Sequence, residues 1–194
     1  MDRKKQYGSD NPLRRPLALG LVTVGALARL IPHPPDFAPV GGMSLFAGAR
    51  LPGWQAYLVP LLLMTITDPI LGAIYGFPAF GYSTAFVYGS FLVNVWIGRR
   101  LRSSQNFLWI GLATVLCTLQ FYLVTNFGVW LLGQMYPHSW SGLATCYLAA
   151  LPFLGRTMAA DLLYSSVLFG LHVWLGRVWH PQDCASAEST VTNQ

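Results

Sequence analysis

Long apolar stretches with almost no charge are the feature that most constrains this chain. Four of them run from Trp54 to Tyr75, Tyr82 to Gly98, Phe107 to Leu132 and Leu154 to Val178. Each is close to the ~20 residues that an α-helix needs to cross the hydrocarbon core of a bilayer. Only 10% of the 194 residues are charged, whereas an average soluble domain is about a quarter charged. The pattern predicts an all-α integral membrane protein.

Three shorter apolar runs complete the predicted bundle. Pro16 to Ile31 ends at a proline-rich cluster and is expected to be the first span. Ala38 to Leu51 is rich in glycine and short for a full span, so we expect a tilted, interrupted or protein-buried helix there. Gly142 to Leu151 is predicted to be a re-entrant or interfacial helix before the last span. The expected fold is a polytopic bundle of about six transmembrane helices.

The basic residues predict an orientation for this bundle. If the chain has six spans, ten of its Lys and Arg residues fall on one side of the membrane: Arg3, Lys4, Lys5, Arg14, Arg15, Arg50, Arg99, Arg100, Arg102 and Arg177. The other side receives at most Arg29 and Arg156. Positive residues that flank spans stay in the cytoplasm. We therefore expect a protein of the bacterial inner membrane with both termini on the cytoplasmic side. The predicted organisation is a basic cytoplasmic tail at 1–15, a six-helix domain at 16–178 and a disordered cytoplasmic tail at 179–194.

Several functional classes find no support in the sequence. The net charge of +5 comes from clusters that flank apolar runs, so nucleic acid is not an expected partner. The three cysteines have no metal-ligand spacing, and no metal or cofactor is expected. The chain lacks Gly-x-Ser-x-Gly, His-Glu-x-x-His and phosphate-cradling glycine loops. We therefore predict no catalytic residue and no enzymatic activity.

Two aspartates inside predicted spans are the first candidate site. Asp68 and Asp161 are ionisable groups at positions where charge is expensive, so each is a functional candidate. Arg29 and Arg156 are the expected partners in an intramembrane charge network. The alternative is a structural one, in which the four residues form ion pairs or caps between helices. The pair Asp68-Pro69 also predicts a helix break with the aspartate as N-cap.

A predicted outer loop and nearby aromatic residues form the second candidate site. The proline-rigid loop that contains His33, Asp36 and Phe37 could cover a ligand pocket. Aromatic rings such as that of Trp130 could stack a flat organic ligand, and the amide of Asn126 could orient it. The alternatives are a rigid turn between helices and an ordinary aromatic belt at the membrane interface.

The segment Arg29-Leu-Ile-Pro-His-Pro-Pro-Asp-Phe-Ala-Pro-Val-Gly resembles a bacterial membrane protein family of unknown function. Its members share an Arg-x-x-Pro-His-Pro-x-Asn-Phe-x-Pro signature and are often labelled as transport proteins; this chain has Asp36 where the signature has Asn. The resemblance extends to about Gly170. The layout is also similar to the S components of energy-coupling-factor vitamin transporters, which implies six helices and ligand capture near the outer face.

Together these features predict a transport or solute-binding membrane protein that captures a small organic, vitamin-like molecule from the outer face. The expected partners are the lipid bilayer and a small-molecule solute. The resemblance to S components adds an energising transporter subunit, and ATP-driven work would need one because the chain has no nucleotide-binding motif. The alternative is a structural or assembly subunit of a membrane complex that binds no ligand.

Overall fold

A computed structural model describes residues 14–31, 37–76, 78–102 and 104–179. These residues form six α-helices and no strand, which confirms the all-α prediction. The helices are α1 (Arg14–Ala28), α2 (Val40–Arg50), α3 (Gln55–Tyr75), α4 (Thr84–Arg100), α5 (Phe107–Leu132) and α6 (Trp140–Trp179). Nearly all of the two predicted tails, 1–15 and 179–194, lies outside the described residues.

Three of the described helices, α3, α5 and α6, are long and apolar enough to cross a membrane, rather than the expected six. The other three are shorter, with 15 residues in α1, 11 in α2 and 17 in α4. At 1.5 Å per residue these helices are about 16 to 26 Å long, which is less than the ~30 Å of a hydrocarbon core. The apolar runs at α1 and α2 included flanking turn residues and so overestimated the lengths of these two helices, whereas the run at α4 has the same length as the helix.

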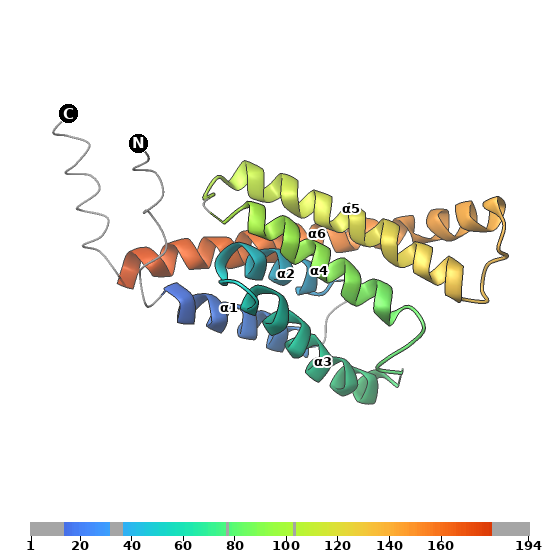
Figure 1. Cartoon of the computed structure of the whole chain (residues 1–194), viewed down its shortest axis with the longest axis horizontal. Helices are drawn as coiled ribbons and strands as arrows, with labels where there is room; N and C mark the ends of the chain where they lie inside the picture. Colours follow the sequence, from blue (N-terminus) through green and yellow to red (C-terminus); the bar gives the residue numbers. More distant parts are fainter. Residues whose placement is uncertain (1–13, 32–36, 77, 103, 180–194) are drawn as a thin grey trace.

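The predicted re-entrant helix at Gly142 to Leu151 is wrong. These residues and the last predicted span form one continuous helix, α6, of 40 residues with Pro152 inside it. A proline removes one backbone hydrogen bond but does not end a helix whose turns on both sides pack against a neighbour, here α5. The helix is about 60 Å long, and its first turns extend with the end of α5 beyond the other helices (Figure 1).

The helix break predicted at Asp68-Pro69 is also wrong. Helix α3 runs without interruption through both Pro60 and Pro69. An N-cap side chain must accept a hydrogen bond from its own helix two or three residues later. The Asp68 carboxylate instead contacts the side chains of Arg29, which follows α1, and of Tyr88 on α4, so α3 continues through this position.

Helix α2 is the centre of the bundle. It packs against each of the other five described helices, and every residue from Val40 to Ala49 is buried. Figure 1 shows this short helix enclosed by longer ones. Of the alternatives for the second apolar run, the structure therefore has the protein-buried helix. Its glycines permit this placement, because a side chain at Gly48 would overlap the backbone carbonyl of Val95 on α4.

Candidate functional site

Asp161 on α6 lies at the N-terminus of α2, deep in the bundle. Its exposed fraction is only 3%. The backbone of Gly42 forms a hydrogen bond with the carboxylate, and a side chain at Gly41 would overlap it. From α5, the hydroxyl of Thr118 donates a hydrogen bond to Asp161 Oδ2 at 2.7 Å. Asp161 thus joins three helices through one carboxylate.

This carboxylate accepts a hydrogen bond at the N-terminus of α2, where the local sequence provides no capping side chain. The helix follows Pro39, which has no side-chain cap hydrogen bond, so the first backbone N–H groups need another acceptor. In an apolar interior no water supplies one. A negative charge at a helix N-terminus also interacts favourably with the helix dipole. Asp161 therefore caps α2 from a neighbouring helix.

Asp68 on α3 forms a second polar cluster with different partners. Arg29, which follows α1, forms an ion pair with Asp68 Oδ1 at 2.5 Å and donates to the Thr67 hydroxyl at 3.1 Å. The Tyr88 hydroxyl of α4 donates to Asp68 Oδ2 at 2.6 Å. The predicted partnership of Arg29 and Asp68 is present in the structure as this ion pair. It links α1, α3 and α4.

The predicted network does not extend to the remaining pair. Arg156 is exposed on α6 and forms no ion pair with Asp161 or with any other described residue. Asp161 is held by neutral donors instead, a hydroxyl and a backbone amide. The two aspartates therefore differ in kind, since one has a cation beside it and the other does not.

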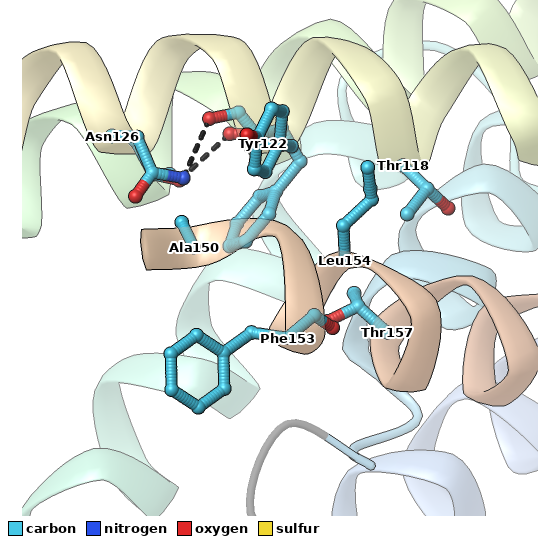
Figure 2. A pocket seen from close by; sticks show the side chains of 9 residues that line it. Thr118, Tyr122, Asn126, Ala150, Phe153, Leu154 and Thr157 are labelled. Carbon is cyan, nitrogen blue, oxygen red and sulfur yellow. Dashed lines mark hydrogen bonds between the residues drawn. The ribbon is translucent and has the colours of Figure 1, made fainter. Parts of the chain in front are cut away.

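A cavity of about 180 Å³ lies between α5 and α6. It is lined by Thr118, Phe121, Tyr122, Thr125, Asn126, Ala150, Phe153, Leu154 and Thr157. Figure 2 shows side chains from the two helices facing each other across it. Five of these side chains are polar and four are apolar, and none is charged. Small-molecule sites typically combine an apolar lining with a few placed polar groups in this way.

The polar groups of the lining mainly offer acceptors. The Thr125 and Thr157 hydroxyls donate their protons to the carbonyls of Phe121 and Phe153. The Tyr122 hydroxyl donates to another backbone carbonyl, that of Tyr147. Each hydroxyl proton is thereby used within the protein, while the oxygen lone pairs remain. The cavity thus suits a molecule that brings its own hydrogen-bond donors.

The predicted ligand residues fall in separate places. Asn126 lines the cavity, with its Nδ2 donating to the carbonyl of Tyr122 at 2.8 Å. Trp130 is not in the lining, because its indole N–H donates to the Pro137 carbonyl in the turn after α5. Phe37 packs on the ring of Tyr164. His33 and Asp36 lie outside the described residues.

Sequence reasoning missed most of the cavity. Thr118, Tyr122 and Thr125 follow one another at intervals of four and three residues, which places them on one face of α5. A polar stripe at this spacing in an apolar helix was the signal that could have located the site. The facing Thr157 gave no such signal, since its position depends on α6 being one continuous helix.

No cluster in the described part of the chain resembles a metal centre. No group of three or more His, Cys, Asp or Glu side chains gathers there closely enough to hold a metal ion. His138 packs edge-on against the ring of Trp130. The polar groups of the cavity are hydroxyls and one amide, which bind and orient a molecule but supply no strong nucleophile or acid.

Fold and cavity together define a class: an all-helical protein with helices able to cross a membrane and a polar-lined cavity between two of them. The chain belongs to a family of unknown function, DUF6580, whose sequence profile matches residues 10–183. This confirms the expectation that the chain belongs to a family without an assigned function. No curated protein and no solved structure matches the chain.

Proposed function

We propose that this protein is a multi-pass transport or solute-binding protein of the bacterial inner membrane that captures a small organic molecule in the α5–α6 cavity. The observation that carries the proposal is the cavity lining, which has five neutral polar side chains on two membrane-length helices. Polar groups are costly in an apolar interior unless they have a use there. Binding a polar solute is such a use.

The distribution of arginines supports a bundle in which α1 to α6 all lie in the bilayer with both ends of the helix series at the cytoplasmic side. At one end, Arg15 donates to Gln55, Arg50 to the carbonyl of Arg102 and Arg99 to the carbonyl of Gly53. These contacts gather the start of α1 and α3 and the end of α2 and α4. Basic residues concentrate on the cytoplasmic side of membrane proteins.

This orientation places the cavity in the outer half of the membrane. At 1.5 Å per residue, Thr118 lies about 16 Å and Asn126 about 28 Å along α5 from Phe107, at the basic end. The cavity therefore extends from near the middle of the ~30 Å hydrocarbon core to its outer edge. A solute would enter from the outer face, as in the S components of energy-coupling-factor transporters that the layout resembles.

The lining favours a particular class of solute. A cavity of about 180 Å³ holds a molecule not much larger than benzene, which occupies an engineered cavity of about 150 Å³ in another protein. Because the hydroxyl protons are already engaged, the solute should carry N–H or O–H donors. Because the lining has no charge, it should be neutral, with an apolar part against Phe121 and Phe153.

Native mass spectrometry of the detergent-purified protein tests this proposal. The wild-type protein should carry a small molecule at one to one. Ala150→Leu, which fills the cavity, should lose that molecule, whereas Ala149→Leu on the exposed face of the same helix should retain it. Retention of the molecule by Ala150→Leu would exclude this cavity as the site. A wild-type protein without a small molecule but with a second polypeptide would overturn solute capture and favour an assembly subunit.

A further inference from the structure

Arg156 is a charged residue on the outward face of a membrane-length helix, α6. It is exposed, and its guanidinium has no hydrogen bond, ion pair or aromatic partner among the described residues. Arg29, the other arginine predicted on the outer side, is neutralised by Asp68 within the bundle. A guanidinium does not lose its proton in a protein, so Arg156 stays charged. A charge that faces hydrocarbon is costly, and this one therefore needs a counter-charge from outside the chain.

The depth of Arg156 in the proposed membrane follows from its place relative to Asp161. Asp161 lies level with Thr118 of α5, because the two side chains are hydrogen-bonded, and Thr118 is about 16 Å along α5 from the basic end. Helix α6 runs from the outer side toward the basic end, so Arg156 lies about 8 Å further out than Asp161. Its Cα atom is thus at a depth of about 24 Å in a hydrocarbon core of ~30 Å.

The direction of the side chain brings its charge to the outer edge of the core. Side chains on an α-helix tilt toward the N-terminus, which for α6 is the outer end. An arginine that extends this way over about one helical turn, ~5 Å, has its guanidinium at about 29 Å. Its methylene stem then stays in the apolar layer while the charge reaches the interface. Phospholipid phosphates lie at this level, just outside the hydrocarbon core.

An apolar stripe leads from Arg156 toward the middle of the membrane. Ala159, Leu163 and Val167 follow it at intervals of three or four residues, so they share its face of α6. All three are exposed, Leu163 to 50% and Val167 to 44%. A cation at the phosphate level above an exposed apolar stripe is complementary to a phospholipid, which has an anionic phosphate at the interface and an acyl chain below it.

We propose that Arg156 and this stripe bind one phospholipid of the outer leaflet, with the guanidinium paired to the lipid phosphate. The planar guanidinium can donate two parallel N–H···O hydrogen bonds to a phosphate, which makes arginine well suited to this role. The proposal rests on the membrane placement proposed above and not on solute capture. The next residue, Thr157, lines the α5–α6 cavity, so the bound lipid lies beside the proposed solute site.

Solid-state NMR of the full-length protein, reconstituted in phosphatidylglycerol and phosphatidylethanolamine vesicles without phosphate buffer, tests the contact. With the guanidinium carbon of every arginine isotope-labelled, the wild-type spectrum minus that of Arg156→Lys isolates the Arg156 signal. Coupling to phosphorus nuclei, which only the lipids supply, should attenuate this signal. The same difference with Arg29→Lys is the matched control and should show no attenuation, because Arg29 pairs with Asp68. An Arg156 signal without attenuation overturns the proposal.

Native mass spectrometry provides a second test that needs no labelled arginine. Delipidated protein is titrated with phosphatidylglycerol and, separately, with a diacylglycerol that has the same chains but no phosphate. Arg156→Gln should bind one phosphatidylglycerol fewer than the wild-type protein, and Arg156→Lys should retain it because lysine keeps the positive charge. The diacylglycerol should not distinguish the three proteins. Equal binding of phosphatidylglycerol by wild-type protein and Arg156→Gln overturns the proposal.

Failure of the lipid site is distinguishable from failure of the proposed function. Neither measurement uses the solute, so the result is independent of whether the cavity binds one. Membrane placement is tested by flotation of the wild-type protein with the same vesicles before the NMR measurement. Co-flotation supports the placement on which the lipid site depends, whereas a protein that stays behind overturns that placement and the lipid site with it.

Discussion

Gly98 on α4 lies directly against the backbone carbonyl of Leu45 on α2, with no space for a side chain between them. The same two helices also meet at Gly48 and Val95, so their contact is one of backbone against backbone. Close approach of this kind is how membrane helices associate when they lack a hydrophobic driving force between them. The position of α2, and with it the position of the Asp161 cluster, depends on this contact.

Gly98→Ala should therefore destabilise the protein. The added methyl group would overlap the Leu45 carbonyl, and overpacking of a tight interface typically costs about 1–3 kcal/mol. The readout is the melting temperature in detergent, followed by scanning fluorimetry. Gly89→Ala on the same helix is the matched control, since a methyl group there meets no atom within 4 Å. Equal melting temperatures for both variants would contradict the close contact.

The cap on α2 predicts an order of stability at Asp161. Asp161→Ala removes the acceptor of the α2 N-terminus, and loss of an N-cap typically costs about 0.5–2 kcal/mol. Asp161→Asn retains an acceptor oxygen and should melt between the wild-type protein and the alanine variant. Thermal unfolding of the three proteins in one detergent provides the comparison. An asparagine variant that is less stable than the alanine variant would argue against a capping role.

The ion pair between Arg29 and Asp68 predicts a coupled pair of mutational effects. Removal of one partner of a buried pair strands a charge and can cost about 3–5 kcal/mol. Because both side chains here keep some solvent exposure, 18% and 11%, we expect a smaller loss. The double variant Arg29→Met with Asp68→Leu should be less destabilised than the sum of the single variants. Additive losses in the double-mutant cycle would show that the pair contributes no coupling energy.

A functional role for Asp68 predicts a different result from a structural one. Asp68→Asn should abolish transport of the identified solute while leaving the folded yield unchanged if the carboxylate takes part in transport. Parallel measurement of uptake in vesicles and of monodisperse protein by size exclusion separates the two. An equal loss of yield and uptake would assign Asp68 to the scaffold that joins α1, α3 and α4.

Cysteine labelling tests the orientation. In a background in which Cys117, Cys146 and Cys184 are replaced by serine, Ser139→Cys in the α5–α6 connection should react with a membrane-impermeant maleimide in intact cells. Arg102→Cys, at the opposite end of the bundle, should react only after the membrane is opened. Both positions are exposed in the structure, so accessibility within the protein does not differ. The reverse pattern would invert the bundle and place the cavity in the cytoplasmic half.

Composition and periodicity located the helices well where a helix is apolar along its length and exposed on much of its surface. The apolar run from Phe107 to Leu132 coincides with α5, and the run from Trp54 to Tyr75 differs from α3 by one residue. The predicted helix breaks at Pro69 and Pro152 were wrong, because both prolines lie inside continuous helices. The local sequence shows a helix-breaking residue but not the tertiary packing that stabilises the helix on both sides of it. Helix length alone also cannot distinguish a short span from a helix buried in protein, as in α2.

The candidate site was less accessible to sequence reasoning than the fold. Hydropathy identified Asp68 and Asp161 as unusual and led to Arg29, because charges in an apolar interior need compensation. It could not show that Asp161 is compensated by Thr118 and a helix N-terminus, since backbone groups leave no trace in residue type. Asn126 was selected as an amide near the outer face, but which partner helix it faces depends on the packing of α5 against α6.

The depth of Asp161 has an electrical consequence. Its partner Thr118 lies about 16 Å from the basic end of α5, roughly half of the ~30 Å across which a membrane voltage falls. In the proposed orientation, a charge on the Asp161 carboxylate would therefore lie about halfway across that voltage. At 100 mV this corresponds to about 1 kcal/mol, half of the ~2.3 kcal/mol for a full crossing.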